Sequence, residues 1–199
     1  MATAAENAEA ARKLFLDVGD ARGESTGLTV LGHVALERED YETAESFFQA
    51  VVEVNPENGL PLGINYHNLA STAFGRGDFE LAVKRYRRAL EEFHQHDDEY
   101  GIALTEQYLA MVAVEEGGYD EAAAYLRHPL VVFREMGFLQ YAAQCLDLIG
   151  AVVRARGDAA EATRMFAGAP AEEFDAARAE GVHLGENELF DRAGRAVSA

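Results

Sequence analysis

The sequence has few cysteines and few lysines, and it lacks any long apolar run. Its single cysteine, Cys145, cannot form an internal disulfide, which fits a reducing compartment. No apolar stretch approaches the roughly 20 residues that a membrane span needs, and the amino terminus lacks the pattern of a signal peptide. We therefore expect a cytoplasmic protein. Arginine and alanine are frequent while Lys13 and Lys84 are the only lysines, a bias typical of a high-GC bacterium.

Positive charge is also scarce. The chain carries 17 basic and 35 acidic residues, a formal net charge of −18 at pH 7. Such a chain is repelled by nucleic-acid phosphates and by anionic membrane surfaces, so neither is expected as a partner. With 49% hydrophobic and 26% charged residues, the composition is that of a folded protein. The length predicts a single domain over residues 1–199.

A short sequence pattern occurs four times. A leucine or isoleucine is followed by a small residue at Leu31-Gly32, Leu69-Ala70, Leu109-Ala110 and Ile149-Gly150. A turn rich in glycine and aspartate comes next, and after it an alanine with a large apolar residue four positions later. These pairs are Ala44 and Phe48, Ala82 and Tyr86, Ala122 and Leu126, and Ala162 and Phe166.

Each part of the pattern has a physical reason. The small residue lets a neighbouring helix approach closely, and a glycine at the turn can adopt the left-handed conformation that ends a helix. Asp40, Asp78 and Asp158 can accept the free amide hydrogens that begin the next helix. The alanine and the apolar residue lie on one stripe of that second helix. The pattern therefore predicts antiparallel helix hairpins that stack into a superhelix, and no segment alternates as a strand does. The predicted class is all-α.

These residues resemble the tetratricopeptide repeat, and Pro56 stands at its usual closing position in the first full copy. The spacing near 40 residues is similar to the carboxy-terminal repeat region of bacterial LuxR-type regulators and of NB-ARC-like nucleotide-binding signalling ATPases. The phrases at residues 14–23 and 133–137 are typical of that subtype. The resemblance implies a right-handed superhelix with a concave groove. The phosphate-binding loop and the DNA-binding helices of those regulators are absent from this sequence.

The register predicts the segments of the chain. Residues 3–18 form the second helix of an incomplete leading repeat, with Leu14, Phe15 and Val18 pointing inward. Four repeats fill residues 24–168 (24–60, 63–100, 101–140 and 141–168), and capping helices occupy residues 171–198. Pro129 falls inside a second helix and should kink or break it.

The resemblance implies that the first helix of each hairpin lines the groove. That surface mixes apolar and polar groups, which suits a protein or peptide segment, or a small amphiphilic molecule, better than a highly charged ligand. Only Asn68 matches the carboxylate clamp of some tetratricopeptide domains, so a clamp is not expected. The predicted groove residues are Thr29, His33, Glu37, His67, Asn68, Ser71, Phe74, Gln107, Tyr108, Met111, Glu115, Asp147 and Arg154.

Several of these side chains can titrate, which leaves a chemical alternative open. His33, Glu37, His67 and Asp147 could form an acid–base group or hold a metal. The plainer interpretation is a set of polar groove residues, because no second motif supports catalysis. Ser71 and His67 lack any sign of an oxyanion hole.

Three other features have plain structural interpretations. The run from His94 to Asp98 is expected to be a solvated turn, although adventitious metal binding is its main alternative. Cys145 is expected to be a buried, inert thiol. The cluster of Arg85, Arg87 and Arg88 is expected to be a solvated face balanced by nearby glutamates.

The sequence thus favours a non-catalytic adaptor or regulator that binds a protein segment or effector in its groove, without a cofactor or metal. The alternative is a small-molecule-binding protein or enzyme of a bacterial specialised-metabolite pathway, with His33, Glu37, His67 and Asp147 as acid–base groups. Self-association as a homodimer is compatible with either hypothesis.

Overall fold

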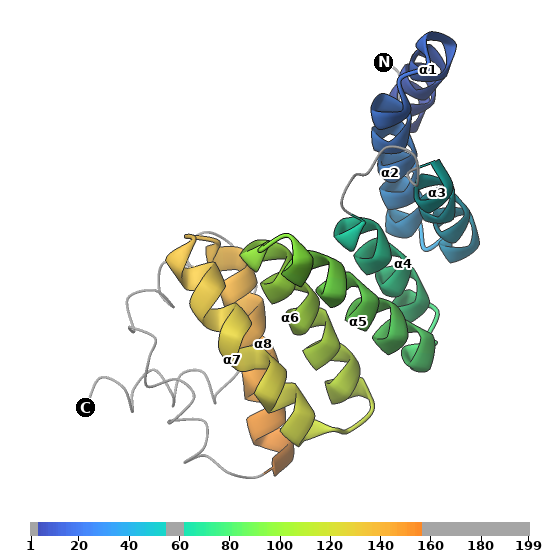
Figure 1. The fold of residues 1–199 in the computed structure, drawn as a ribbon. Helices are drawn as coiled ribbons and strands as arrows, with labels where there is room; N and C mark the ends of the chain where they lie inside the picture. The colour runs from blue at the N-terminus through green and yellow to red at the C-terminus, as the bar shows by residue number, and fades with distance from the viewer. Residues whose placement is uncertain (1–3, 55–61, 157–199) are drawn as a thin grey trace. The chain divides into compact units, whose positions relative to one another are not determined.

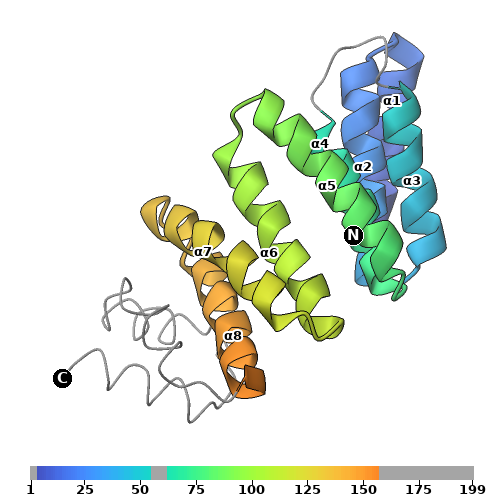
Figure 2. The same ribbon diagram turned by 60° about the horizontal axis from the view of Figure 1, so that its bottom comes forward.

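The structure is a computed structural model that describes residues 4–54 and 62–156. Within these residues all regular structure is α-helical, and no strand is found. The helices are α1 (Ala4–Val18), α2 (Ala21–Glu37), α3 (Tyr41–Val54), α4 (Gly63–Gly75), α5 (Phe79–Gln95), α6 (Glu99–Glu115), α7 (Tyr119–Glu135) and α8 (Leu139–Arg156). Figure 1 shows them in chain order, and the antiparallel pair of α7 and α8 is clearest in Figure 2.

The chain falls into two compact units, Met1–Gly101 and Ile102–Ala199, which are described separately here. In the first unit α1 packs on α2, α2 on α3, α3 on α4, and α4 on α5. In the second unit α7 packs on α8. The prediction of an all-α helical repeat is confirmed. The predicted capping helices at 171–198 lie outside the described residues, and the single-domain assignment stays a prediction.

Aspartates begin several of the helices, as the pattern predicts. Asp40 accepts the backbone N–H of Thr43 at 3.2 Å, and Asp78 accepts that of Leu81 at 3.1 Å. Two further caps were not predicted: Asp20 accepts the N–H of Gly23 and Asp98 that of Gly101. Asp158 lies outside the described residues.

The turns between successive helices need a left-handed residue. Gly77 and Gly117 have φ of 76° and 75°, which an L side chain rarely adopts. In the first hairpin Glu39 takes this place with φ of 58°, so the turn keeps its shape without glycine.

The alanine and apolar stripes form the centre of each hairpin. Ala44, Phe48, Ala82, Tyr86, Ala122 and Leu126 are all fully buried. The small residue of the first helix makes this possible, because the ring of Phe48 lies directly over Gly32. The predicted fourth pair, Ala162 and Phe166, is outside the described residues.

One prediction about the fold is wrong. Leu14 and Val18 do not point inward: both are strongly exposed, and only Phe15 packs, with its ring against Gly23. Within the described residues of its unit α1 has α2 as its helical neighbour, which leaves room to bury one flank only.

Of the two effects expected of Pro129, a break is not found, and a kink stays a prediction. α7 runs without interruption from Tyr119 to Glu135, and Pro129 is buried within it. The missing N–H costs one backbone hydrogen bond, and packing of the helix around it offsets that loss.

Candidate functional site

In the first unit the predicted groove residues of α2 lie at its exposed surface. His33 is exposed and sets its ring edge-on to Phe48, with ring centroids 5.4 Å apart. Partial loss of hydration lowers the pKa of His33, while the nearby carboxylate of Glu37 raises it. Glu37 is exposed at the end of α2. Half-buried Thr29, one turn earlier, donates its hydroxyl to the carbonyl of Ser25.

The predicted groove residues of α4 include a buried histidine that packs on an aromatic ring of α5. His67 is buried, and its ring meets Tyr86 edge-on at 5.2 Å. The hydroxyl groups of Tyr86 and Ser71 are hydrogen-bonded at 3.0 Å, and Ser71 also donates to the carbonyl of His67. Burial lowers the pKa of His67 to about 3, with a further contribution from His33. His67 is therefore neutral at pH 7 and hidden from solvent.

Buried amides are a second feature of α4. Asn68 and Asn65 are both buried, and neither Asn68 Nδ2 nor Asn65 Oδ1 has a hydrogen-bond partner among the described residues. Phe74, at the end of the helix, is half-buried against Phe79, with centroids 5.7 Å apart. The sequence placed Asn68 and His67 on an open groove wall, whereas the structure buries both. Their role in recognition stays a prediction.

In the second unit Gln107 of α6 joins α8. Its Nε2 lies 3.3 Å from the carbonyl oxygen of Tyr141 and 3.3 Å from Oε1 of Gln144. The side chain is buried, and its Oε1 has no partner among the described residues. Gln107 therefore ties α6 to α8 rather than standing free on a surface.

The remaining predicted residues of this unit are more accessible. Tyr108, Met111 and Asp147 are half-buried, and Glu115 is exposed at the end of α6. Burial, and then the proximity of Tyr141, raise the pKa of Tyr108. Arg154 belongs to α8, but its side chain is not described.

In the first unit the structure thus places His33 and Glu37 on α2, with the His33 ring against Phe48, and His67 on α4, with its ring against Tyr86. Tyr108 lies near Tyr141 in the second unit, where Gln107 links α6 to α8. Whether the two sets share one groove stays a prediction.

Metal and thiol chemistry find little support in the described chain. No group of three or more His, Cys, Asp or Glu side chains that could hold a metal ion is found among residues 4–54 and 62–156. Cys145 is buried, and burial raises the pKa of its thiol to about 12, as expected for an inert cysteine.

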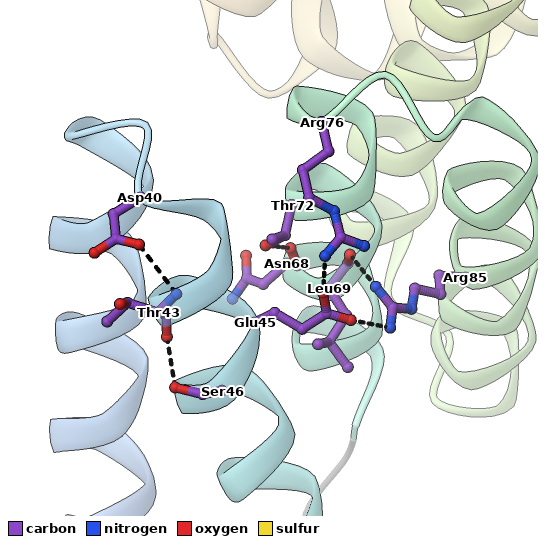
Figure 3. A network of polar contacts seen from close by, with 9 residues as sticks. All are labelled: Asp40, Thr43, Glu45, Ser46, Asn68, Leu69, Thr72, Arg76 and Arg85. Atoms are coloured by element: carbon purple, nitrogen blue, oxygen red, sulfur yellow. Dashed lines mark hydrogen bonds and ion pairs between the residues drawn. The ribbon is translucent and has the colours of Figure 1, made fainter.

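A polar network between three helices was missed by the sequence analysis. Glu45 of α3 binds Arg76, at the end of α4, and Arg85 of α5 (Figure 3). Arg85 also donates to the carbonyl of Leu69 at 3.0 Å. The interpretation of Arg85 as a solvated residue is therefore wrong. For Arg88 the expected solvated position, balanced by nearby glutamates, is confirmed, because this residue pairs with Glu91 and Glu92. No local spacing signals Glu45, because its partners lie 31 and 40 residues away.

Comparison with known proteins agrees with this geometry. A tetratricopeptide repeat family model matches residues 24–93, a segment that spans most of α2 and reaches into α5. No curated protein matches the sequence. Among solved structures, the crystal structure of BtubC (BKLC) from P. vanneervenii is similar, with a TM-score of 0.68 and 21% identity over 98% of this chain and 91% of that one. In the part of the chain that is described, no helix is long and apolar enough to cross a membrane. Residues 24–93 thus match the tetratricopeptide repeat, and the described chain has the fold of a tetratricopeptide-like helical repeat.

Proposed function

We propose that this chain is a non-catalytic binding module that holds a segment of a partner protein against the first helices of its repeats. The observation that carries the proposal is the exposed pair His33 and Glu37 on α2. This helix shares a buried apolar cluster with α4, whose Ser71 and Phe74 are half-buried. Polar and aromatic groups that solvent can reach, held on rigid helices, are typical of recognition surfaces.

The base beneath these residues is well packed. Phe48 and Tyr86 are fully buried, and they support the rings of His33 and His67 respectively. The contact with Phe48 holds the accessible ring of His33 in place before a partner arrives, which lowers the entropy cost of binding. The tetratricopeptide match spans these same helices, and repeats of this type generally bind protein segments.

The chemistry of the surface suggests what kind of segment fits. Glu37 is negative, Phe74 offers part of an aromatic ring, and the lowered pKa of His33 keeps that residue largely neutral at pH 7. The whole chain carries −18 charges. A partner segment would be complementary to this surface if it carried a basic residue that pairs with Glu37 and an apolar residue that packs on Phe74.

The alternative, an enzyme or small-molecule-binding protein, rests on His33, Glu37, His67 and Asp147 as acid–base groups. A general base must be reachable and must titrate near the working pH. His67 is buried and its pKa is about 3, so it meets neither condition in this structure. The binding module is therefore the better-supported proposal.

We further propose that the module acts as an adaptor or regulator in the bacterial cytoplasm, comparable to the repeat regions of LuxR-type and NB-ARC-like regulators. The near-40-residue repeat and the turn phrases support this comparison. The partner would then be another protein of the same signalling system.

Selection from a displayed library of random peptides on the immobilised full chain tests the proposal. The selected peptide is then titrated calorimetrically into the wild type and into Glu37→Gln and Phe74→Ala. We expect each substitution to weaken binding about tenfold, or roughly 1.4 kcal/mol. The matched controls are Gln49→Ala in α3 and Arg87→Ala in α5, at exposed positions of second helices. These two substitutions should leave the affinity for the peptide unchanged.

Circular dichroism verifies that each variant is folded, which matters most for Phe74 because its ring packs on Phe79. Failure to select any peptide, or a peptide that binds all four variants like the wild type, would refute the proposal.

A further inference from the structure

Two polar side chains on the exposed side of α2 are open to a ligand. His33 and Glu37 are four residues apart, a spacing that places their Cβ atoms about 5–6 Å from each other on one face of the helix. Both residues are exposed, and among the described residues neither side chain has a hydrogen-bond or ion-pair partner. The surface therefore offers a carboxylate and an imidazole side by side.

The imidazole of His33 can accept a hydrogen bond at neutral pH. Partial burial lowers its pKa below the ordinary 6.5, and the carboxylate of Glu37 raises it by a smaller amount. A neutral imidazole has one N–H donor and one acceptor nitrogen. The ring stands edge-on to Phe48 of α3, with centroids 5.4 Å apart, and this contact restricts its movement.

The groups around His33 do not disturb this neutral state. His67 of α4 carries no charge near neutral pH, because burial lowers its pKa to about 3. The neighbour in α3 is the uncharged ring of Phe48, and no described charged side chain of α1 or α3 acts on the pKa of His33. Among the described residues Glu37 is therefore the charge that His33 senses.

We propose that the basic residue of the partner segment is an arginine, whose guanidinium group bridges the carboxylate of Glu37 and the neutral imidazole of His33. This inference deepens the proposed function and rests on it. A guanidinium group presents five N–H donors in a planar fork, so it can donate to two acceptors one helical turn apart. The ammonium group of lysine is a compact point charge, and once it pairs with the carboxylate it gains less from the imidazole.

The same geometry makes binding depend on pH. Protonation of His33 removes its acceptor nitrogen and creates a positive charge that pairs with Glu37 on the same helix. This charge also repels the guanidinium group. Affinity for a segment with arginine should therefore fall when the pH drops from about 7.5 to about 5.0.

Calorimetric titration of the full chain with peptides selected from a library without histidine or acidic residues tests the proposal. Each peptide is made with arginine, lysine or uncharged citrulline at its basic position. At about pH 7.5 the arginine form should bind about fivefold more tightly than the lysine form, and citrulline should bind most weakly. At about pH 5.0 the arginine form should bind the wild type about fivefold more weakly than at pH 7.5.

Two substitutions of His33 separate its roles as acceptor and as titrating group. His33→Ala should lose both the preference for arginine and the pH dependence. His33→Gln keeps an acceptor that does not titrate, so it should retain the preference and lose the pH dependence. The matched controls are His94→Ala in α5 and Glu42→Gln in α3, both at exposed positions of second helices, and they should behave like the wild type. Circular dichroism at both pH values verifies that each variant is folded.

The possible outcomes distinguish this inference from the proposed function. Peptides that bind equally well with lysine and with arginine would overturn the inference and leave the proposed function standing. The same holds for a preference that survives His33→Ala, or for a pH dependence that His94→Ala removes and His33→Gln does not. If no peptide is selected at all, the proposed function fails, and this inference fails with it.

Discussion

The contact between Gly32 of α2 and Phe48 of α3 offers a direct test of how tightly the first hairpin is packed. A Cβ atom at position 32 would lie 2.4 Å from Cε1 and 2.6 Å from Cζ of Phe48. Carbon atoms in contact prefer separations of about 3.5–4.0 Å, so the overlap would be about 1 Å. Phe48 is fully buried in a cluster with Ala35, Ala44 and Leu69, so its ring can move away only by displacing packed neighbours.

Two effects oppose each other in Gly32→Ala. Alanine is a better helix former than glycine by about 1 kcal/mol, which would stabilise an exposed helix. Forcing an extra carbon into a packed core costs about 1–3 kcal/mol, and more where the neighbour cannot move. We expect the clash to dominate and the variant to lose about 1–2 kcal/mol of unfolding free energy. Urea titration followed by circular dichroism measures this loss.

Phe48→Leu is the partner variant, because it removes the atoms that the new methyl group would meet. Alone it should destabilise the protein by leaving a cavity. Combined with Gly32→Ala, the two losses should be less than additive by about 1 kcal/mol. The reasoning is refuted if Gly32→Ala is as stable as the wild type, or if the double variant shows simple additivity.

Three further predictions concern a helix cap, an ion network and a buried imidazole. Gly118→Asn should stabilise the protein by about 0.5–1 kcal/mol. Gly118 begins α7 with backbone dihedral angles similar to those of the capping residue Asp78, but it has no side chain to cap the helix. An unchanged melting temperature would contradict this prediction. Glu45→Gln should cost about 1 kcal/mol in low salt and less in high salt, because it removes the partner shared by two arginines; equal losses at both salt concentrations would argue against an ionic contribution. The folded-state pKa of His67 is about 3 against 6.5 for the free side chain, so the unfolded chain binds the proton first, and the wild type should lose up to about 1.4 kcal/mol per pH unit as pH falls below 6.5. Unfolding titrations between pH 6.5 and 5 should show a shallower slope for His67→Gln, and identical slopes would refute the assignment.

Much of the fold could be predicted because its determinants are local. A helix stripe, a turn and a capping aspartate each involve residues within a few positions of one another, and the pattern recurs along the chain. Ala82 and Tyr86 are fully buried, and Asp78 caps the next helix, as their spacing predicts. The pairing of Phe15 with Gly23 and of Phe93 with Gly101 is equally local, and the eight-residue spacing is visible in the sequence.

The candidate site was harder to predict. The repeat register gives the side of the helix on which a residue lies, but it does not give how far neighbouring helices bury that residue. His33 and His67 both carry imidazoles on first helices, yet one is exposed and the other buried. The difference comes from neighbours distant in sequence: the ring of Tyr86 stands against His67. In α1 the same limit led to the opposite error: the apolar pattern predicts burial of Leu14, but this side chain is 66% exposed, and no helix among the described residues covers it.

Long-range ionic contacts are the part that sequence reasoning misses most completely. Arg88 pairs with glutamates three and four positions away, which spacing predicts, whereas Arg85 reaches Glu45 of α3 (Figure 3). Glu45 follows the stripe alanine Ala44, and the equivalent residue after Ala82 is Val83, so the repeat carries no trace of the pair. Ionic contacts therefore join α3, α4 and α5 at this place, in addition to the packing that the repeats share. Salt should weaken this contact while leaving the apolar hairpin cores intact.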